Sequence, residues 1–421
     1  MHLLENTIRN YDWGATSGIP EILGREPDGS PQAELWIGAH PGAPSHLPEL
    51  NATLDVYIAQ HPGQTLGSAV REEFGDRLPF LMKLLSAGTA LSIQAHPSAE
   101  QAADGYASEE FAGVPRDAAG RNFKDPYHKP EMVYALTEFH ALCGFRPVGE
   151  TLSTLELFSS DGPVLQELCA ALADDDAAAA IESCVRRILE GGADVERLTA
   201  AISGQAIELV EAADDDLRPS IATVIELSKQ YPNDPGILLS LFMNRVVLHP
   251  GQALTLPAGN IHAYLSGLAV EVMAASDNVL RGGLTTKNID IPELLRVLDF
   301  HPFPVRLERQ SSIAHSTVIA PAVREFQLQR IVLTDGQAPL EHNGPAVGLC
   351  IDGDLTLSSG QGKQLKVGKG VSFFVGAEET DVRISGHGTL FITTVGQRAG
   401  AGKQRPSGTA GMADATDTAR K

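Results

Sequence analysis

The sequence predicts a mainly β protein with two β-barrels and an α-helical domain inserted into the first barrel. Residues 1 to about 100 form short apolar runs broken by Gly and Pro, a pattern typical of strands joined by turns. From residue 149 to 246, Ala, Leu and Glu dominate and apolar residues recur three and four apart, which is the helical period. Strand-like runs resume at His249-Pro250. A chain of 421 residues is long enough for two or three domains.

The first barrel is expected to combine residues 1–148 with residues 247–310, on either side of the helical insertion. One helical stretch is expected within the first part, near Leu54 to Phe74, because its pattern is helical rather than alternating. A discontinuous domain of this kind requires that the chain leaves the barrel and returns to it.

The inserted helical domain is expected over residues 149–246. Apolar residues at helical spacing include Ile181, Cys184, Val185 and Ile188. The acidic runs at 174–176 and 214–216 are interpreted as solvated helix boundaries rather than as metal sites, since runs of like charge are usually exposed.

Two stretches resemble the turn of cupin β-barrels (jelly rolls), in which a strand delivers a ligand His into the barrel mouth. The first is Leu254–Gly259, which leads to His262. The second, Leu365–Val375, has no His or Glu at the equivalent place. Residues 311–396 are therefore expected to form a second cupin-like barrel without a metal. The tail from 397 to 421 has one Met as its only large apolar residue and is expected to be disordered.

Composition and charge narrow the function classes. With 43% hydrophobic and 20% charged residues the chain is typical of a soluble protein, and no apolar run approaches the roughly 20 residues that span a bilayer. Met1–Glu5 lacks the regions of a signal peptide, and the four scattered cysteines suit a reducing cytoplasm. The net charge of −21 disfavours a nucleic-acid partner. An anionic substrate therefore needs a local cationic patch.

Three stretches far apart in the sequence are rich in metal-ligand residue types. Gln94 and His96 are two residues apart in an apolar run, so on a strand both side chains point to one face. Glu131 and His262 supply a carboxylate and a second imidazole. This set of ligands suits zinc, and an added water would mark a catalytic site. Taken alone, each stretch favours the simpler interpretation of an inward-facing strand pair or a satisfied core histidine.

Taken together, these stretches and their surroundings resemble the type I phosphomannose isomerases, over most of residues 1–310 and in the same order. The segments that carry the resemblance are Tyr11–Gly14, Ala33–His40, Leu78–Lys83, Ala90–Pro97, His128–Met132, Phe145–Pro147, His262–Leu265, Ala275–Val279, Arg281, Gly283–Thr285 and Lys287.

Three positions depart from the family's usual pattern. Leu268 follows Gly267 where the family usually has an acidic residue, Gly282 replaces an Ala, and Thr286 replaces a Pro. None of these departures removes a candidate ligand or charge. They bear on substrate preference rather than on the reaction class.

The resemblance implies an aldose-ketose isomerase with one zinc ion per chain, held by Gln94, His96, Glu131 and His262. Mannose 6-phosphate and fructose 6-phosphate interconvert when a proton moves between C2 and C1 through an enediol. This reaction needs a base near the proton and stabilisation of the charge on the sugar oxygens. Zinc held by one carboxylate and three neutral ligands keeps a formal charge of about +1 and acts as a Lewis acid.

Three charged residues are expected to be catalytic. Arg281 is the first, because its planar fork suits oxyanions, and a structural pair with Asp277 is the alternative. Lys129 is expected on the same strand face as Glu131 and is a candidate to touch substrate, with a surface lysine as the alternative. Glu271 is a possible proton-transfer base, or a buried carboxylate paired with a cation.

Other residues are expected to bind the sugar or its phosphate, although each is nearly as consistent with a structural role. These candidates are Ser92, Lys83, His128, Asp277 and Lys287.

Two other function classes stay open at the level of sequence. A non-haem Fe(II) cupin dioxygenase needs only His96, His262 and Glu131. A sugar-binding or regulatory cupin needs no chemistry at all. Gln94 and the nearby cations favour the isomerase, and other aldose phosphates are possible substrates. The expected partner is a small sugar phosphate, the expected state a monomer or weak homo-oligomer, and the flux could run towards glycolysis or towards GDP-mannose and other mannose donors.

Overall fold

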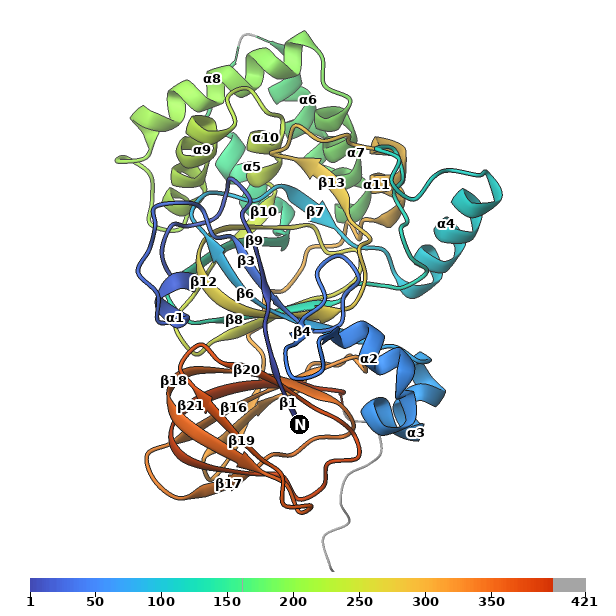
Figure 1. Cartoon of the computed structure of the whole chain (residues 1–421). Coiled ribbons are helices and arrows are strands. Elements are labelled where there is room, and N and C mark those ends of the chain that lie inside the picture. Colours follow the sequence, from blue (N-terminus) through green and yellow to red (C-terminus); the bar gives the residue numbers. More distant parts are fainter. Residues whose placement is uncertain (161, 397–421) are drawn as a thin grey trace, which may run out of the picture.

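The computed structural model describes residues 1–160 and 162–396, so the tail predicted to be disordered lies outside the described residues. Figure 1 shows three layers: helices at one end, a first β-sheet in the middle and a second sheet at the other end. Both large sheets of the described chain are antiparallel throughout. The prediction of a mainly β protein with helices between residues 149 and 246 is confirmed at this level.

The first sheet has ten strands and is built around its longest strand, β12 (His262–Ala274). The other strands are β2 (Thr7–Arg9), β3 (Glu34–Ile37), β6 (Phe80–Ala87), β7 (Ile93–Ala95), β8 (Glu131–Ala135), β9 (Phe139–Phe145), β10 (Met243–Leu248), β11 (Ala253–Leu256) and β13 (Leu280–Gly283). The start of β12 pairs with β7 and β9, and its second half pairs with β6 and β8. Residues from distant parts of the sequence thus meet along one strand.

Strand β12 changes its partners around Gly267. This residue has φ +118°, and a Cβ there would lie 2.5 Å from the carbonyl oxygen of Glu138. Only glycine fits such a close backbone approach at this φ. The glycine therefore lets one strand serve two parts of the sheet, with His262 at its start and Glu271 in its second half.

The second sheet has nine strands. They are β1 (His2–Leu4), β14 (Gln310–Ile313), β15 (Ser316–Ile319), β16 (Gln327–Leu333), β17 (Gln337–Pro339), β18 (Ala346–Ser358), β19 (Gln364–Gly368), β20 (Ser372–Val375) and β21 (Arg383–Thr394). Strand β1 pairs with β20, so the first residues of the chain belong to the second sheet and not to the first barrel as predicted. The pattern of a three-residue strand does not reveal which sheet edge it joins. The two-residue strands β4 (His46–Leu47) and β5 (Ala52–Thr53) form a separate pair.

The helical layer follows β9 directly. It comprises α5 (Val148–Leu155), α6 (Pro163–Leu172), α7 (Ala177–Leu189), α8 (Ala193–Leu209), α9 (Arg218–Gln230) and α10 (Gly236–Ser240). The acidic runs lie at helix boundaries as predicted, and Asp176 caps α7 by accepting from the backbone N–H groups of Ala178 and Ala179. No helix within the described ranges is both long and apolar enough to cross a membrane.

Five further helices lie outside this layer: α1 (Ile19–Ile22), α2 (Leu54–Gln60), α3 (Pro62–Phe74), α4 (Ala99–Phe111) and α11 (Ile291–Val297). Helices α2 and α3 confirm the stretch predicted near Leu54 to Phe74, with a break before Pro62. Helix α4 was not predicted and stands out from the side of the molecule (Figure 1).

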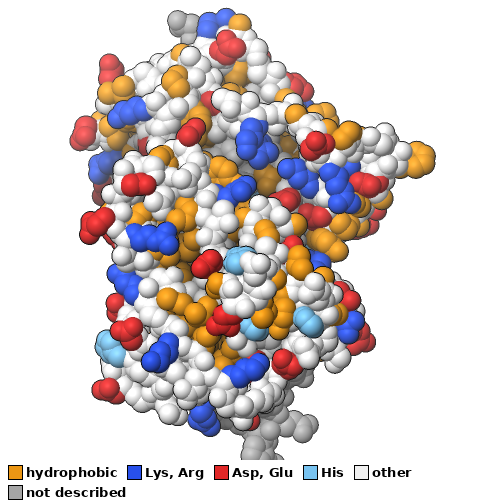
Figure 2. Space-filling model, viewed as in Figure 1, with side chains coloured by type: hydrophobic (Ala, Val, Ile, Leu, Met, Phe, Trp, Pro, Cys, Tyr) orange, Lys and Arg blue, Asp and Glu red, His pale blue; other side chains and the backbone are white. Residues whose placement is uncertain are grey.

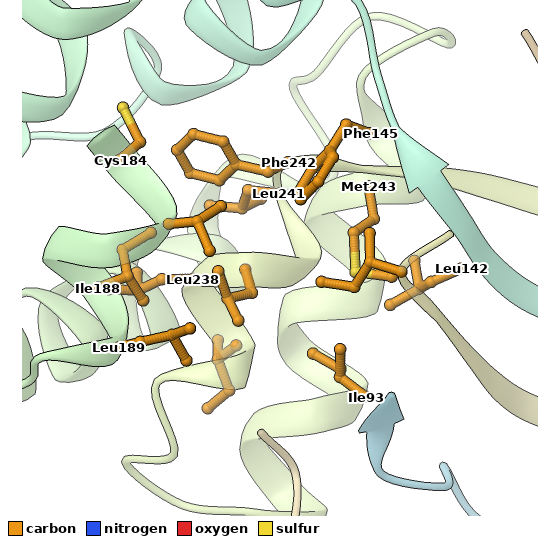
Figure 3. Packing of buried hydrophobic residues seen from close by; sticks show 14 of the residues in the cluster. Ile93, Leu142, Phe145, Cys184, Ile188, Leu189, Leu238, Leu241, Phe242 and Met243 are labelled. Carbon is orange, nitrogen blue, oxygen red and sulfur yellow. The ribbon is translucent and has the colours of Figure 1, made fainter. Parts of the chain in front are cut away.

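The helical layer and the first sheet share one hydrophobic core. Figure 3 shows Ile188 and Leu189 of α7 facing Leu238 and Leu241, with Ile93 on the sheet side of the cluster. Ile93 and Ala95 of β7 are both fully buried in this core. Because side chains alternate along a strand, Gln94 between them points away from the helices. The packing of β7 thus directs Gln94 and His96 to the opposite face.

The two sheets also pack against each other. Met132, Tyr134 and Val270 of the first sheet share a buried cluster with Phe374 and Phe391 of the second. The rings of Tyr134 and Phe391 lie 5.0 Å apart in an edge-on arrangement. The second sheet therefore supports β8 and β12 from the side opposite to the helices.

Removal of the Phe242 side chain should destabilise the junction between helices and sheet. Phe242 is 1% exposed and lies in the shared core (Figure 3). Phe242→Ala should lower the free energy of unfolding by about 3–5 kcal/mol, through lost transfer energy and a residual cavity. Chemical denaturation measures this change. Ile207→Ala on α8, at a side chain 64% exposed, is the control and should cost no more than about 0.5 kcal/mol. Equal effects in both variants would contradict the shared core.

Candidate metal centre and its surroundings

The register of the short strand β7 brings three candidate residues together. Gln94 lies opposite His262 of β12 on one side and opposite Arg281 of β13 on the other. Directly opposed residues of antiparallel strands present their side chains on the same face. His96 follows two residues after Gln94 and lies just beyond the strand. The predicted juxtaposition of an amide, two imidazoles and a guanidinium on one face therefore agrees with the pairing of the strands.

His96, Glu131 and His262 form a buried cluster. Their potential ligand atoms all lie within 4.8 Å of one another, and none of the three side chains is more than 5% exposed. The Nε2 atom of His96 lies 3.2 Å from Oε1 of Glu131, and that of His262 lies 3.5 Å from Oε2. Each imidazole thus approaches a different oxygen of one carboxylate.

Backbone carbonyls fix the tautomer of both histidines. Nδ1 of His96 lies 2.8 Å from the carbonyl oxygen of Asn278, and Nδ1 of His262 lies 3.0 Å from that of Asn260. A carbonyl only accepts, so each Nδ1 must carry the proton. In the neutral rings Nε2 then has a free lone pair. Metal-binding histidines are commonly oriented by a second hydrogen bond of this kind.

The cluster fits a divalent cation. Burial is the main cause that lowers the pKa of His96 to about 4, so this ring is neutral near pH 7. The Nε2 atoms of both rings are buried without a hydrogen-bond partner. Lone pairs that face a carboxylate repel it, and a cation between them removes the repulsion. Two imidazoles and a carboxylate, with Gln94 as the fourth predicted ligand, form a donor set suited to zinc.

Lys129 lies on the same face as Glu131, as alternation predicts. Its Nζ is 2.9 Å from Oε1 of Glu131, and the side chain is 9% exposed. Burial opposes ionisation of Glu131, but the Lys129 ammonium holds the pKa of this carboxyl well below its ordinary value. Glu131 is therefore ionised, and Lys129 is not the surface lysine of the alternative interpretation.

Glu271 and Lys83 form a second buried group of charges beside the cluster. They are register partners on β12 and β6, and Nζ of Lys83 lies 3.0 Å from Glu271 and 3.3 Å from Glu34. Burial is the largest cause that raises the pKa of Glu271, while Lys83 opposes the rise. Burial alone would lower the pKa of Lys83, but Glu271 and Glu34 raise it. Lys83 is therefore charged, and its predicted contact with substrate stays a prediction.

A group of cations lies on the Arg281 side of the cluster. Arg281 forms no ion pair with any residue in the described ranges, and burial lowers its pKa. Burial also lowers the pKa of Lys287, and Arg281 and Lys124 lower it further because they are nearby cations. Figure 2 shows Lys and Arg side chains gathered on this face around the position of β13. On a chain of net charge −21, an anionic substrate requires local positive charge of this kind.

No ion pair joins Arg281 to Asp277 among the described residues. Asp277 instead lies 3.4 Å from Nε2 of His40, a buried residue in the loop that follows β3. His40 was not among the predicted site residues, although Lys83 and Lys129 are close enough to affect its pKa. Its position near both lysines places it in the same region as the candidate site.

His128 is not brought to the cluster. Its Nε2 lies 2.6 Å from Oε1 of Glu325, so the ring is bound to the loop between β15 and β16 of the second sheet. The position of His128 agrees with strand alternation, which puts His128 on the other face from Lys129. The contact with Glu325 does not support the predicted contact between His128 and substrate. Ser92 is half-buried two residues before Gln94, and its role stays a prediction.

Two further residues organise the site although the sequence patterns did not single them out. The carboxylate of Asp125 accepts from Ser276 and from the backbone of Asp277, and the Asn278 side chain binds the backbone of residues 124, 125 and 127. These bonds hold the loop whose carbonyl orients His96. Asn278 belongs to a segment that carries the family resemblance, but no sequence pattern pointed to Asp125.

Comparisons with known proteins place this chain beside one enzyme family. The family model "Phosphomannose isomerase type I, catalytic domain" matches residues 1–148, and "Mannose-6-phosphate isomerase, cupin domain" matches residues 316–395. The mannose-6-phosphate isomerase of Escherichia coli is 38% identical over 399 residues, which cover 93% of this chain and 98% of that protein.

Solved structures give the same result. A crystal structure of mannose 6-phosphate isomerase bound with zinc and yttrium is 34% identical, with a TM-score of 0.85 over 94% of this chain and all of the other. A zinc-bound holo structure is also 34% identical, with a TM-score of 0.84 over 94% and 99%.

Loss of either imidazole should release the metal. His96→Ala or His262→Ala leaves the first coordination shell incomplete, so zinc affinity should fall at least about 100-fold, beyond the effect typical of outer-shell changes. Metal analysis after dialysis against a weak chelator measures this loss. His301→Ala is the matched control, because His301 is 80% exposed and paired with Asp299. Full zinc occupancy in His96→Ala or His262→Ala would remove that residue from the site.

Proposed function

The chain belongs to the type I phosphomannose isomerase family, and from this premise we propose how its site performs the reaction. The protein is an aldose-ketose isomerase that interconverts mannose 6-phosphate and fructose 6-phosphate. The observation that carries the proposal is the buried His96–Glu131–His262 cluster, with tautomers fixed for metal binding and unpaired cations beside it.

Gln94, His96, Glu131 and His262 would hold one zinc ion. When bound, zinc supplies a Lewis acid that stabilises negative charge on the sugar's carbonyl oxygen. Gln94 as a neutral ligand leaves more positive charge on the site than a second carboxylate would. Lys129, which lies against Glu131, orients the sugar oxygens near this position and excludes water from the carboxylate.

Arg281 stabilises the charge that develops on the enediol oxygens. It is half-buried and has no carboxylate partner among the described residues, so its guanidinium is available to substrate. A partly buried cation interacts more strongly with a developing oxyanion than an exposed one does. Lys287 and Lys124 continue the positive patch and bind the phosphate end of the substrate.

Glu271 moves the proton between C2 and C1. Its burial raises the pKa towards the range in which a carboxylate is an effective general base near neutral pH, and this supports the role. Lys83 holds the carboxylate in place at 3.0 Å and keeps enough of it ionised to accept a proton. The pairing with a cation, first considered as an alternative, is thus part of the proposed role.

The competing function classes receive no support from the comparisons. The oxygenase and the binding-only cupin each explain the three-residue cluster, but neither needs the Arg281–Lys287 patch or the charges of Glu271 and Lys83.

The proposed finer architecture consists of two cupin-like barrels and a helical domain at 149–246. The cupin-domain match and the two large sheets support this proposal. We also propose a cytoplasmic location, which the four free cysteines support. A monomer or weak homo-oligomer and a role in the supply of GDP-mannose are proposed from family membership alone.

Replacement of Arg281 should reduce turnover without loss of zinc. Arg281→Ala removes a charged donor that acts in the transition state, so kcat should fall roughly 10²–10³-fold. Arg281→Lys keeps the charge but loses the fork and should recover only part of the loss. Steady-state kinetics, zinc analysis and thermal melting are measured together. A raised KM at unchanged kcat would instead assign Arg281 to ground-state binding, and a joint loss of zinc and melting temperature would make it structural.

The phosphate should contribute much of the substrate's binding. Unphosphorylated mannose should be a far poorer substrate than mannose 6-phosphate, because remote binding energy positions the reacting carbons. Lys287→Ala should raise KM for mannose 6-phosphate by about tenfold, the effect of losing one charge-assisted contact, and leave kcat near the parent value. Lys229→Ala, an exposed lysine in the last turn of α9, is the control. Equal kcat/KM for the two sugars would refute the role of the phosphate.

A further inference from the structure

The cations Arg281 and Lys287 have no carboxylate partners in the described chain, and yet they must lie close together. Each repels the other, as does Lys124, and the repulsion opposes a fixed arrangement. Lys287 lies in a loop that follows β13, four residues after Gly283. Something other than ion pairing must therefore fix the course of this loop.

Asp234, in the corner between α9 and α10 of the helical layer, supplies such a restraint. Its Oδ1 accepts from the backbone N–H of Gly236 at 2.7 Å and of Leu284 at 2.9 Å. Its Oδ2 accepts from the backbone N–H of Thr285 at 3.3 Å. One carboxylate thus ties its own corner to two successive residues of the loop that carries Lys287.

The loop needs this restraint because its backbone is unfavourable. Leu284 has φ +53°, in the left-handed region that L side chains rarely adopt, and its side chain is 1% exposed. Gly283 has φ +150°, and a Cβ there would lie 2.7 Å from Cα of Gly236. The two backbones therefore touch, and hydrogen bonds to Asp234 offset the strain at this contact.

The same corner also holds the strand that carries the metal ligands. Gln230 accepts from the backbone N–H of Ala90 at 2.8 Å, and the Tyr231 hydroxyl donates to the carbonyl of Ala90 at 2.7 Å. Ala90 lies shortly before β7 with Gln94. Figure 1 shows α10 beside β13 at this junction of the helical layer and the first sheet. Residues 230–236 thus contact both the segment that precedes β7 and the loop that follows β13.

We propose that Asp234 is a positioning residue: through the backbone of Leu284 and Thr285 it fixes the loop that carries Lys287 for the phosphate end of the substrate. Asp234 itself touches no substrate, so its effect passes through the loop. This role rests on the proposed function of Lys287. The positioning role of Asp234 would also give the helical layer a function in substrate binding. Among the described residues, this layer otherwise contributes no candidate ligand or catalytic side chain.

The test compares zinc-loaded Asp234→Ala with a matched control in the same layer. Asp176→Ala also removes a carboxylate that accepts from two backbone N–H groups, but at the start of α7 and without contact to the loop. Asp234→Ala should raise KM for mannose 6-phosphate about tenfold, with kcat within about twofold of the parent and full zinc content. Asp176→Ala should leave KM unchanged. A parent-like KM in Asp234→Ala, or equal changes in both variants, overturns the proposal.

A double variant separates this proposal from the proposed function. If Asp234 acts through Lys287, adding Asp234→Ala to Lys287→Ala should raise KM by less than about twofold more, since interacting residues are not additive. Full additivity overturns the positioning role. A raised KM in Lys287→Ala beside a parent-like Asp234→Ala overturns only the positioning role. A parent-like KM in Lys287→Ala overturns the assigned phosphate contact, and with it this proposal.

A milder variant covers the case in which Asp234→Ala does not fold. Asp234→Asn keeps the Oδ1 acceptor but places an amide, which donates, against the N–H of Thr285. KM should rise about threefold at near-parent melting temperature, because one of the three bonds is lost. An unchanged KM in this folded variant overturns the proposal.

Discussion

Two buried imidazoles that must face one carboxylate are the constraint on which this structure depends. Their Nδ1 protons are committed to the carbonyls of Asn278 and Asn260, so both Nε2 lone pairs face Glu131. Without a cation this arrangement is repulsive and costly to bury. The fold therefore has to hold three distant segments in place against that repulsion. The antiparallel register of β7, β8 and β12 and the loop fixed by Asp125 provide this support.

The charges around the cluster are arranged in an order that suits the reaction. Anionic Glu131 lies beside cationic Lys129, and anionic Glu271 lies beside cationic Lys83, both pairs deeply buried. Arg281 is the exception, because it lacks a carboxylate in the described chain and is free to meet an oxyanion. A chain with net charge −21 thus concentrates unpaired positive charge at one place. The helical layer contributes to this arrangement by fixing backbone rather than by supplying ligands.

The sequence predicted the parts of this site that depend on local pattern. The spacing of Gln94 and His96 anticipates one face of a strand, and the helical period of residues 181–188 anticipates a buried helix face. Contacts between a carboxylate and backbone N–H groups have no such pattern, so no sequence motif pointed to Asp125 or Asp234. The pairing of β1 with the second sheet was missed for the same reason, since three residues do not encode a distant partner. The resemblance to a family, rather than composition, supplied the reaction.

If His96, Glu131 and His262 hold the metal proposed above, sugar-phosphate isomerisation requires that metal. The most direct test is a coupled assay of the purified protein that converts mannose 6-phosphate, performed before chelation, after chelation and after zinc is added back. Turnover should be lost on chelation and restored by stoichiometric zinc, with no change in the folded state by circular dichroism. Full turnover in protein shown to be free of metal would contradict this requirement.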